Sequence, residues 1–181
     1  MGKTFDEPES GTEAVPVSLP SLVAVASFAA ICVLFHAFGG QGWVPILDSA
    51  NLALHEAGHP LTGIISSRAS VYGGTLFQLA FPVAVAAHFY RRRHAAGAAA
   101  GVVWLGESLL NVARYMADAR VQQLPLVGGG DHDWTEIFSR WQLLNFDTRV
   151  AGLTRFVAVL LMAWAVWWLY RQWRAGLEPE A

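Results

Sequence analysis

Long apolar runs, interrupted by charged residues at only a few points, are the feature that most constrains how this chain can fold. Charged residues make up 14% of the 181 positions, whereas about a quarter of an ordinary soluble domain is charged. Each run is near the length that a helix needs to cross a bilayer. The sequence therefore predicts an all-α, polytopic bundle in a lipid bilayer, with about five transmembrane helices: residues 21–38, 46–66, 71–90, 95–118 and 151–170.

The segments outside these runs set the expected domain boundaries. Residues 1–20 are polar and acidic, unlike the positively charged start of a secretory signal, and are predicted to be a disordered tail before a retained anchor. Residues 21–174 then form one membrane-embedded domain, and residues 175–181 a second tail. Within the domain, residues 119–150 are the one substantial polar connection, in which residues 134–146 are expected to form a short amphipathic helix.

Arginines indicate the orientation. The triplet Arg91, Arg92 and Arg93 closes the third run and should face the cytoplasm by the positive-inside rule. Five alternating crossings then put Arg171 and Arg174 on the same side and the N-terminus on the other. We expect a multi-pass integral protein of a bacterial inner membrane. The net charge of −2 gives no field that favours nucleic acid as a partner.

The fourth run opens with small residues. Gly97 and Gly101 form a GxxxG spacing, which lets two helices approach closely. This pair of glycines is the predicted contact if the protein forms a homo-oligomer.

The same run also carries a polar stripe. Glu107, Asn111, Arg114 and Asp118 are spaced by four, three and four residues, so they share one face of a helix. Ionisable groups inside a membrane usually face a protein interior or a cavity. The stripe either satisfies itself, with Arg114 paired to Asp118 or Glu107, or lines a path for water. In both cases it should face the second, polar run.

The second run contains His55, Glu56, Ala57, Gly58 and His59. Histidines four residues apart project from one side of a helix and can share a zinc ion. Glu56 lies beside them, where it can take a proton from a water that zinc makes acidic, and Gly58 leaves room beside the ion. The competing interpretation is a pair of hydrogen-bonded histidines without a metal. In a membrane span, such polar groups are costly unless they are used.

A zinc site needs a third protein ligand. The lone Cys32 excludes a multi-cysteine site. Beyond a run of glycines, Asp131 and His132 are the preferred ligands; Asp133 is expected to cap a helix that begins at Trp134, with Glu136 completing a capping box. Glu107 on the polar stripe is a further alternative.

The His55–His59 motif in an apolar helix resembles the site-2 protease class of intramembrane zinc metalloproteases. In that class, a later segment with a proline and an aspartate supplies the third ligand. Residues 124–131 (LPLVGGGD) look like a loose version of it, although His132 stands where the class has glycine. Residues 71–75 (VYGGT) are similar to a glycine-rich turn of smaller members. The resemblance covers residues 51–133 and implies a protease with His55, His59 and Asp131 on zinc.

The expected function is thus a membrane-embedded zinc hydrolase that cleaves a membrane or membrane-proximal peptide, with Glu56 as the general base. The alternative is a non-catalytic metal-binding scaffold or transport component, for which Glu56 would not be needed as a base. A membrane di-iron oxidase needs several clusters of histidines, and the six histidines here include only one cluster.

Overall fold

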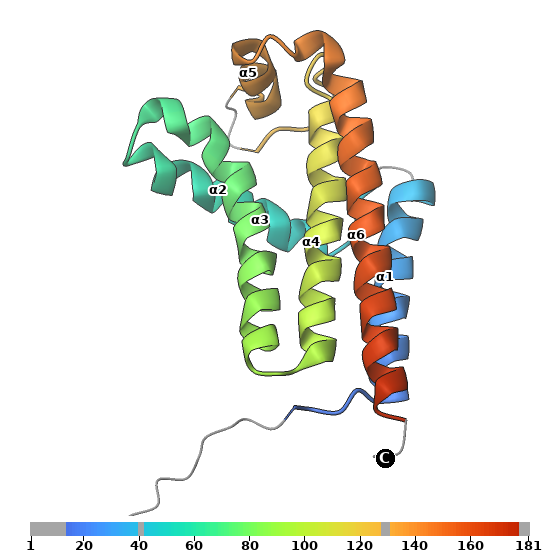
Figure 1. Cartoon of the computed structure of the whole chain (residues 1–181). Helices are drawn as coiled ribbons and strands as arrows, with labels where there is room; N and C mark the ends of the chain where they lie inside the picture. Colours follow the sequence, from blue (N-terminus) through green and yellow to red (C-terminus); the bar gives the residue numbers. More distant parts are fainter. Residues whose placement is uncertain (1–13, 40–41, 128–130, 178–181) are drawn as a thin grey trace, which may run out of the picture.

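The chain folds into helices only, over the residues that the computed structural model describes, which are 14–39, 42–127 and 131–177. This confirms the predicted all-α bundle (Figure 1). The elements are α1 (Leu19–Phe38), α2 (Leu47–Gly63), α3 (Ser67–Arg91), α4 (Ala95–Ala117), α5 (Asp133–Arg140), the 3₁₀ turn η1 (Leu144–Phe146) and α6 (Asp147–Ala175).

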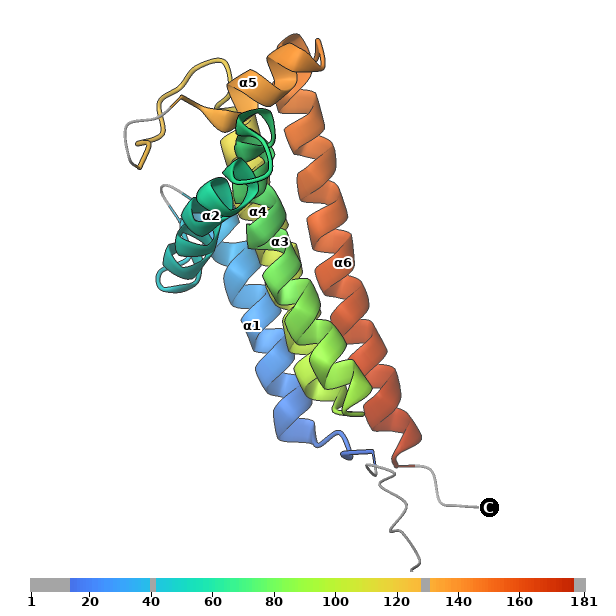
Figure 2. The same ribbon diagram turned by 90° about the vertical axis from the view of Figure 1, so that its left-hand side faces the viewer.

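Four helices are long and apolar enough to cross a membrane: α1, α3, α4 and α6, the last together with η1. The second predicted span differs. It forms α2, which has 17 residues and is therefore about 25 Å long, shorter than a hydrocarbon core of about 30 Å. Helix α2 lies obliquely across the upper half of the bundle (Figures 1 and 2). Its buried residues include Asp48, Asn51 and His55, so α2 turns polar side chains into the protein.

Helix α4 lies at the centre and contacts α1, α3 and α6. Small residues permit these close contacts. A Cβ atom added at Gly101 would lie 2.7 Å from the backbone nitrogen of Ala86, and one added at Gly97 would lie 2.6 Å from the ring of Phe89. The close approach predicted from the GxxxG spacing therefore occurs within the chain, between α3 and α4. The glycine face expected to mediate a homo-oligomer is covered by α3.

The start of α1, the turn between α3 and α4, and the end of α6 lie at one end of the bundle (Figure 1). Residues 14–18, expected to belong to a disordered tail, contribute to this end: the backbone N–H of Val15 donates to the carbonyl of Arg93 at 3.2 Å. Five crossings predicted that α1 would begin opposite the arginine triplet. Instead they share an end, because α2 does not run from one end of the bundle to the other (Figure 1).

The polar connection contains the expected amphipathic helix, α5, although it ends at Arg140 rather than at residue 146. Its apolar side chains Trp134, Ile137 and Phe138 are buried and belong to a cluster with Val112 and Met116 of α4. This packing fixes α5 at the upper end of the bundle, beside the C-terminal half of α2.

Candidate metal centre

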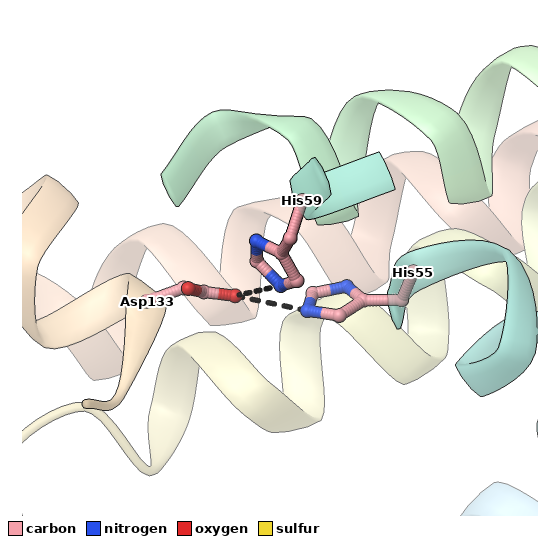
Figure 3. Close-up of side chains that lie close together, drawn as sticks. All are labelled: His55, His59 and Asp133. Carbon is pink, nitrogen blue, oxygen red and sulfur yellow. Dashed lines mark hydrogen bonds and ion pairs between the residues drawn. The ribbon is translucent and has the colours of Figure 1, made fainter. Parts of the chain in front are cut away.

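Two histidines of α2 converge on one carboxylate of α5 (Figure 3). The Nε2 atoms of His55 and His59 lie 2.9 and 3.3 Å from Oδ2 of Asp133. Ligand atoms around a tetrahedral zinc ion, at about 2.0–2.2 Å from the metal, are roughly 3.3 Å from one another. The three side chains therefore fit the donor set of a zinc ion with little rearrangement.

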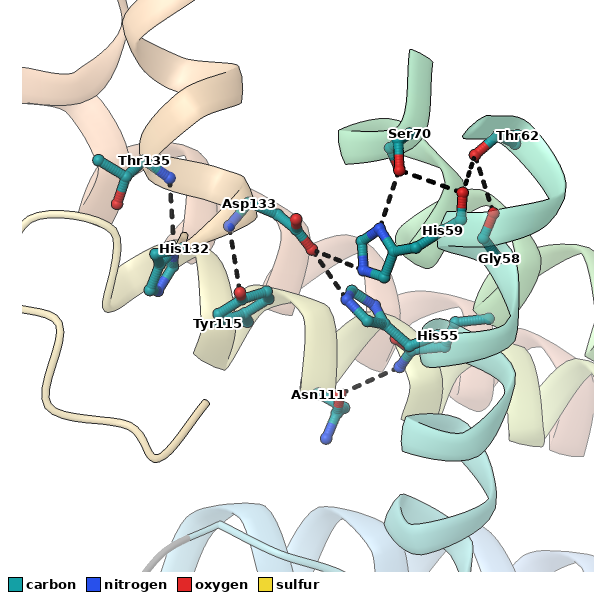
Figure 4. Close-up of polar contacts among 11 residues, drawn as sticks. His55, Gly58, His59, Thr62, Ser70, Asn111, Tyr115, His132, Asp133 and Thr135 are labelled. Carbon is teal, nitrogen blue, oxygen red and sulfur yellow. Dashed lines mark hydrogen bonds and ion pairs between the residues drawn. The ribbon is translucent and has the colours of Figure 1, made fainter. Parts of the chain in front are cut away.

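The hydrogen bond of His59 determines which of its nitrogen atoms is free. Its Nδ1 lies 2.9 Å from the carbonyl oxygen of Ser70 (Figure 4). A carbonyl only accepts, so Nδ1 carries a proton. Nε2 faces the carboxylate of Asp133 at 3.3 Å, a contact that either a second ring proton or a cation bound between the two atoms satisfies. A histidine whose other nitrogen donates to a backbone carbonyl is the usual arrangement around a metal ion.

Glycines bring α2 and α3 together behind the histidines. A Cβ atom at Gly58 would collide with the carbonyl group of Gly73, so the backbones of α2 and α3 are in direct contact where the two helices cross. Gly58 therefore makes room for α3 rather than for an ion. The stretch expected to form a glycine-rich turn, residues 71–75, is instead helical. Within it, Gly74 adjoins His55, since a Cβ added there would lie 2.5 Å from Nε2.

We expect Gly74→Ala to weaken zinc binding while the protein still folds. The added methyl group would displace the end of the His55 ring, and the misplacement of ligands by altered neighbours typically costs 10–100-fold in metal affinity. Competition with a chromogenic chelator would measure it. Gly152→Ala is the control, because nothing lies within 4 Å of a Cβ atom at that helical position. Equal affinities of the two variants would contradict the packing described for His55.

Asp133 is the first residue of α5 rather than its cap. The cap is His132, whose Nδ1 accepts from the backbone N–H of Thr135 at 3.3 Å. Burial lowers the pKa of His132, so the ring is neutral and its proton is on Nε2, 3.4 Å from Oδ2 of Asp118. Nδ1 is thus used by the helix cap, and Nε2 lies near Asp118 without a hydrogen-bond partner, so neither nitrogen faces the α2 histidines. The roles expected of His132 and Asp133 are exchanged: the histidine caps the helix and the aspartate meets His55 and His59.

The backbone of Asp133 is held by Tyr115, whose hydroxyl accepts its N–H at 3.2 Å (Figure 4). Asp131, the other preferred ligand, is exposed. It lines a cavity of about 470 Å³ together with His55, His59 and Asp133, but it is not part of the group whose ligand atoms converge. Asp131 therefore lies at the mouth of the site.

Glu56 is half-buried and lines two cavities that both have His55 in their walls. One is the cavity that contains Asp131. The other has a volume of about 330 Å³ and lies between α2, α4 and the loop formed by residues 124–127. Glu56 thus adjoins both the convergent ligands and space that water or a substrate can occupy.

Comparisons with protein-family models, curated proteins and solved structures find no match for this chain. The interpretation of the site therefore rests on its own geometry. Of the expected site residues, His55 and His59 converge with Asp133, Glu56 and Asp131 line the same cavity, and His132 lies apart.

The polar stripe of α4 faces α2, as expected. Asn51 donates to Oε2 of Glu107 at 2.6 Å, and Asn111 donates to Oδ1 of Asp48 at 2.7 Å. Arg114 differs from the expected pairing: its guanidinium lies 5.9 Å from the ring centre of Trp43, and both side chains line the 330 Å³ cavity.

Asp118, the last residue of the stripe, accepts backbone hydrogen bonds from Gln123 and Leu124 at 2.9 and 3.0 Å. It thereby shapes the loop over the smaller cavity. The sequence interpretation missed two partners of the site, Tyr115 and Ser70. Tyr115 follows Asn111 by one helical turn, so the stripe itself was a signal for it. Ser70 contributes only its backbone carbonyl, which every residue has, so the sequence gives no indication of this contact.

Proposed function

We propose that this chain is a membrane-embedded zinc-dependent hydrolase that cleaves peptides within or next to the membrane. The observation that carries the proposal is the convergence of His55, His59 and Asp133 beside two cavities that Glu56 also lines. Two histidines and one carboxylate, with a position left for water, are a donor set of catalytic zinc sites.

The side chains of the site would have separate roles. His55, His59 and Asp133 would hold the ion, and Ser70 and Tyr115 orient two of these ligands. Zinc bound there would polarise a water molecule and the scissile carbonyl. The Glu56 carboxylate takes a proton from the attacking water and passes it to the departing amine nitrogen, so that it acts first as base and then as acid.

The walls of the smaller cavity indicate the class of substrate. Trp43, Leu52 and residues 124–127 supply apolar surface, and Asn111 and Arg114 add polar groups. Mostly apolar walls with a few polar groups suit an apolar side chain next to a peptide bond. A membrane-spanning or membrane-proximal peptide supplies both.

Metal removal tests the proposal. We expect the purified protein in liposomes to cleave some members of a mixture of single-span peptides, with the products identified by mass spectrometry. Dialysis against a chelator should abolish cleavage because no ion remains to polarise the water, and zinc, but not magnesium, should restore it.

Two other results would contradict the proposed hydrolase. Cleavage that survives complete metal removal would exclude a metallohydrolase. Zinc bound at His55 and His59 without cleavage of any peptide in the mixture would favour the non-catalytic metal-binding scaffold.

A further inference from the structure

A second group of metal-ligating side chains lies deeper in the bundle, where α1, α2 and α4 meet. It consists of His36, Asp48 and Glu107, each of which presents one ligand atom within 4.8 Å of the others. Nε2 of His36 lies 3.4 Å from Oε1 of Glu107. That is long for a hydrogen bond but close to the separation of roughly 3.3 Å between two ligands of one tetrahedral ion.

The two carboxylates are the most deeply buried acids of the bundle. Asp48 and Glu107 are both fully buried, and among the described residues the only ion-pair partner of either is His36. The guanidinium of Arg114, on the same helix as Glu107, lies 5.9 Å from the ring centre of Trp43. Burying two carboxyl groups side by side is costly unless a shared proton or a bound cation offsets their charge.

Neutral donors orient both carboxyl groups. Oδ2 of Asp48 accepts the backbone N–H of Val44 at 2.6 Å, and Oδ1 accepts from Asn111. Oε2 of Glu107 accepts from Asn51, which in turn accepts from Trp104 at 2.9 Å. Such oriented outer partners are what metal-ligating carboxylates have around them.

We propose that His36, Asp48 and Glu107 form a second binding site, for a divalent transition-metal cation such as zinc. One imidazole and two carboxylates suit such a cation in hardness and charge. Asp48, Asn51, His55 and His59 follow one face of α2, so this ion would fasten the start of the helix that carries the first site. Its role is structural, because it ties α1 and α4 to α2.

Zinc stoichiometry tests the proposal with the full chain in detergent, stripped by chelator, reloaded with zinc and dialysed before mass spectrometry. We expect two ions per chain in the unaltered protein, one in His55→Ala, one in His36→Ala and none in the double variant. Glu107→Gln, which keeps an oxygen for Asn51 to donate to, should also lose one ion. Elution volume and helical circular dichroism verify that each variant is folded.

Thermal unfolding gives a second readout that does not depend on activity. Zinc should still raise the melting temperature of His55→Ala, where only the second site remains, and should not raise that of the double variant. A single ion that disappears in His55→Ala would overturn the second site and leave the proposed hydrolase intact. A single ion that persists in His55→Ala and disappears in His36→Ala would support the second site and overturn the proposed function. Retention of both ions in folded Glu107→Gln and His36→Ala would also overturn the second site.

Discussion

Replacing Asp133 with alanine should remove zinc from the first site, while replacing Asp131 with alanine should leave it bound. Among the acids that the structure describes, only Asp133 places an oxygen near both histidine Nε2 atoms, at 2.9 and 3.3 Å. Loss of a direct ligand should cost more than the roughly 10–100-fold that loss of an outer partner costs. Asp131 is a matched control, because it is the same residue type two positions earlier and is exposed.

His132→Asn completes the comparison. Asparagine is a good helix cap, so this variant should keep α5 in place and retain zinc. Isothermal titration of the metal-free variants would give the three affinities. Weak binding in Asp131→Ala or His132→Asn, with tight binding in Asp133→Ala, would mean that the loop rearranges around the ion and that the ligands expected from the sequence are used after all.

The second large effect is expected at Glu56. Glu56→Gln keeps the size of the side chain but removes its ability to accept a proton, so peptide cleavage should fall by roughly 10²–10⁴-fold. The ligands are untouched, and zinc should remain bound. The decrease should appear in kcat, because proton transfer occurs in the chemical step.

Glu136→Gln is the matched control for that variant. It makes the same chemical change at another acid that lines the larger cavity, where Glu136 is exposed and paired with Arg140. Its cleavage rate should stay close to that of the unaltered protein. Cleavage at the normal rate by Glu56→Gln would remove Glu56 from the mechanism, and equal losses in both variants would point to a general effect of charge near the cavity.

The helices and the histidine pair could be predicted from the sequence because both depend on local periodicity. Runs near bilayer length mark α1, α3, α4 and α6, and the four-residue spacing of His55 and His59 places both rings on one side of α2. The spacing of Glu107 and Asn111 likewise predicted a polar face, and α2 is the helix that it meets.

The remaining features depend on tertiary contacts that periodicity does not encode. The sequence predicted residues 46–66 as a membrane span, but α2 takes an oblique course, with backbone contact to α3 at Gly58 and Gly73. An aspartate before a helix is most often its cap, so the capping rule favoured Asp133 in that role. In the structure His132 is the cap of α5 instead. Its ring is buried against α4, with its centroid 4.1 Å from that of the Tyr115 ring.

The start of α1, the arginine turn and the end of α6 lie at one end of the bundle (Figure 1). The side of the membrane that this end faces decides on which side the first site opens. That site lies toward the opposite end, between α2 and α5 (Figure 1). If the arginine turn faces the cytosol, as expected from the sequence, the metal supply and the products of the proposed hydrolase would belong to the extracytoplasmic side. We therefore expect zinc loading to follow the external supply of the metal rather than the tightly buffered pool of the cytosol.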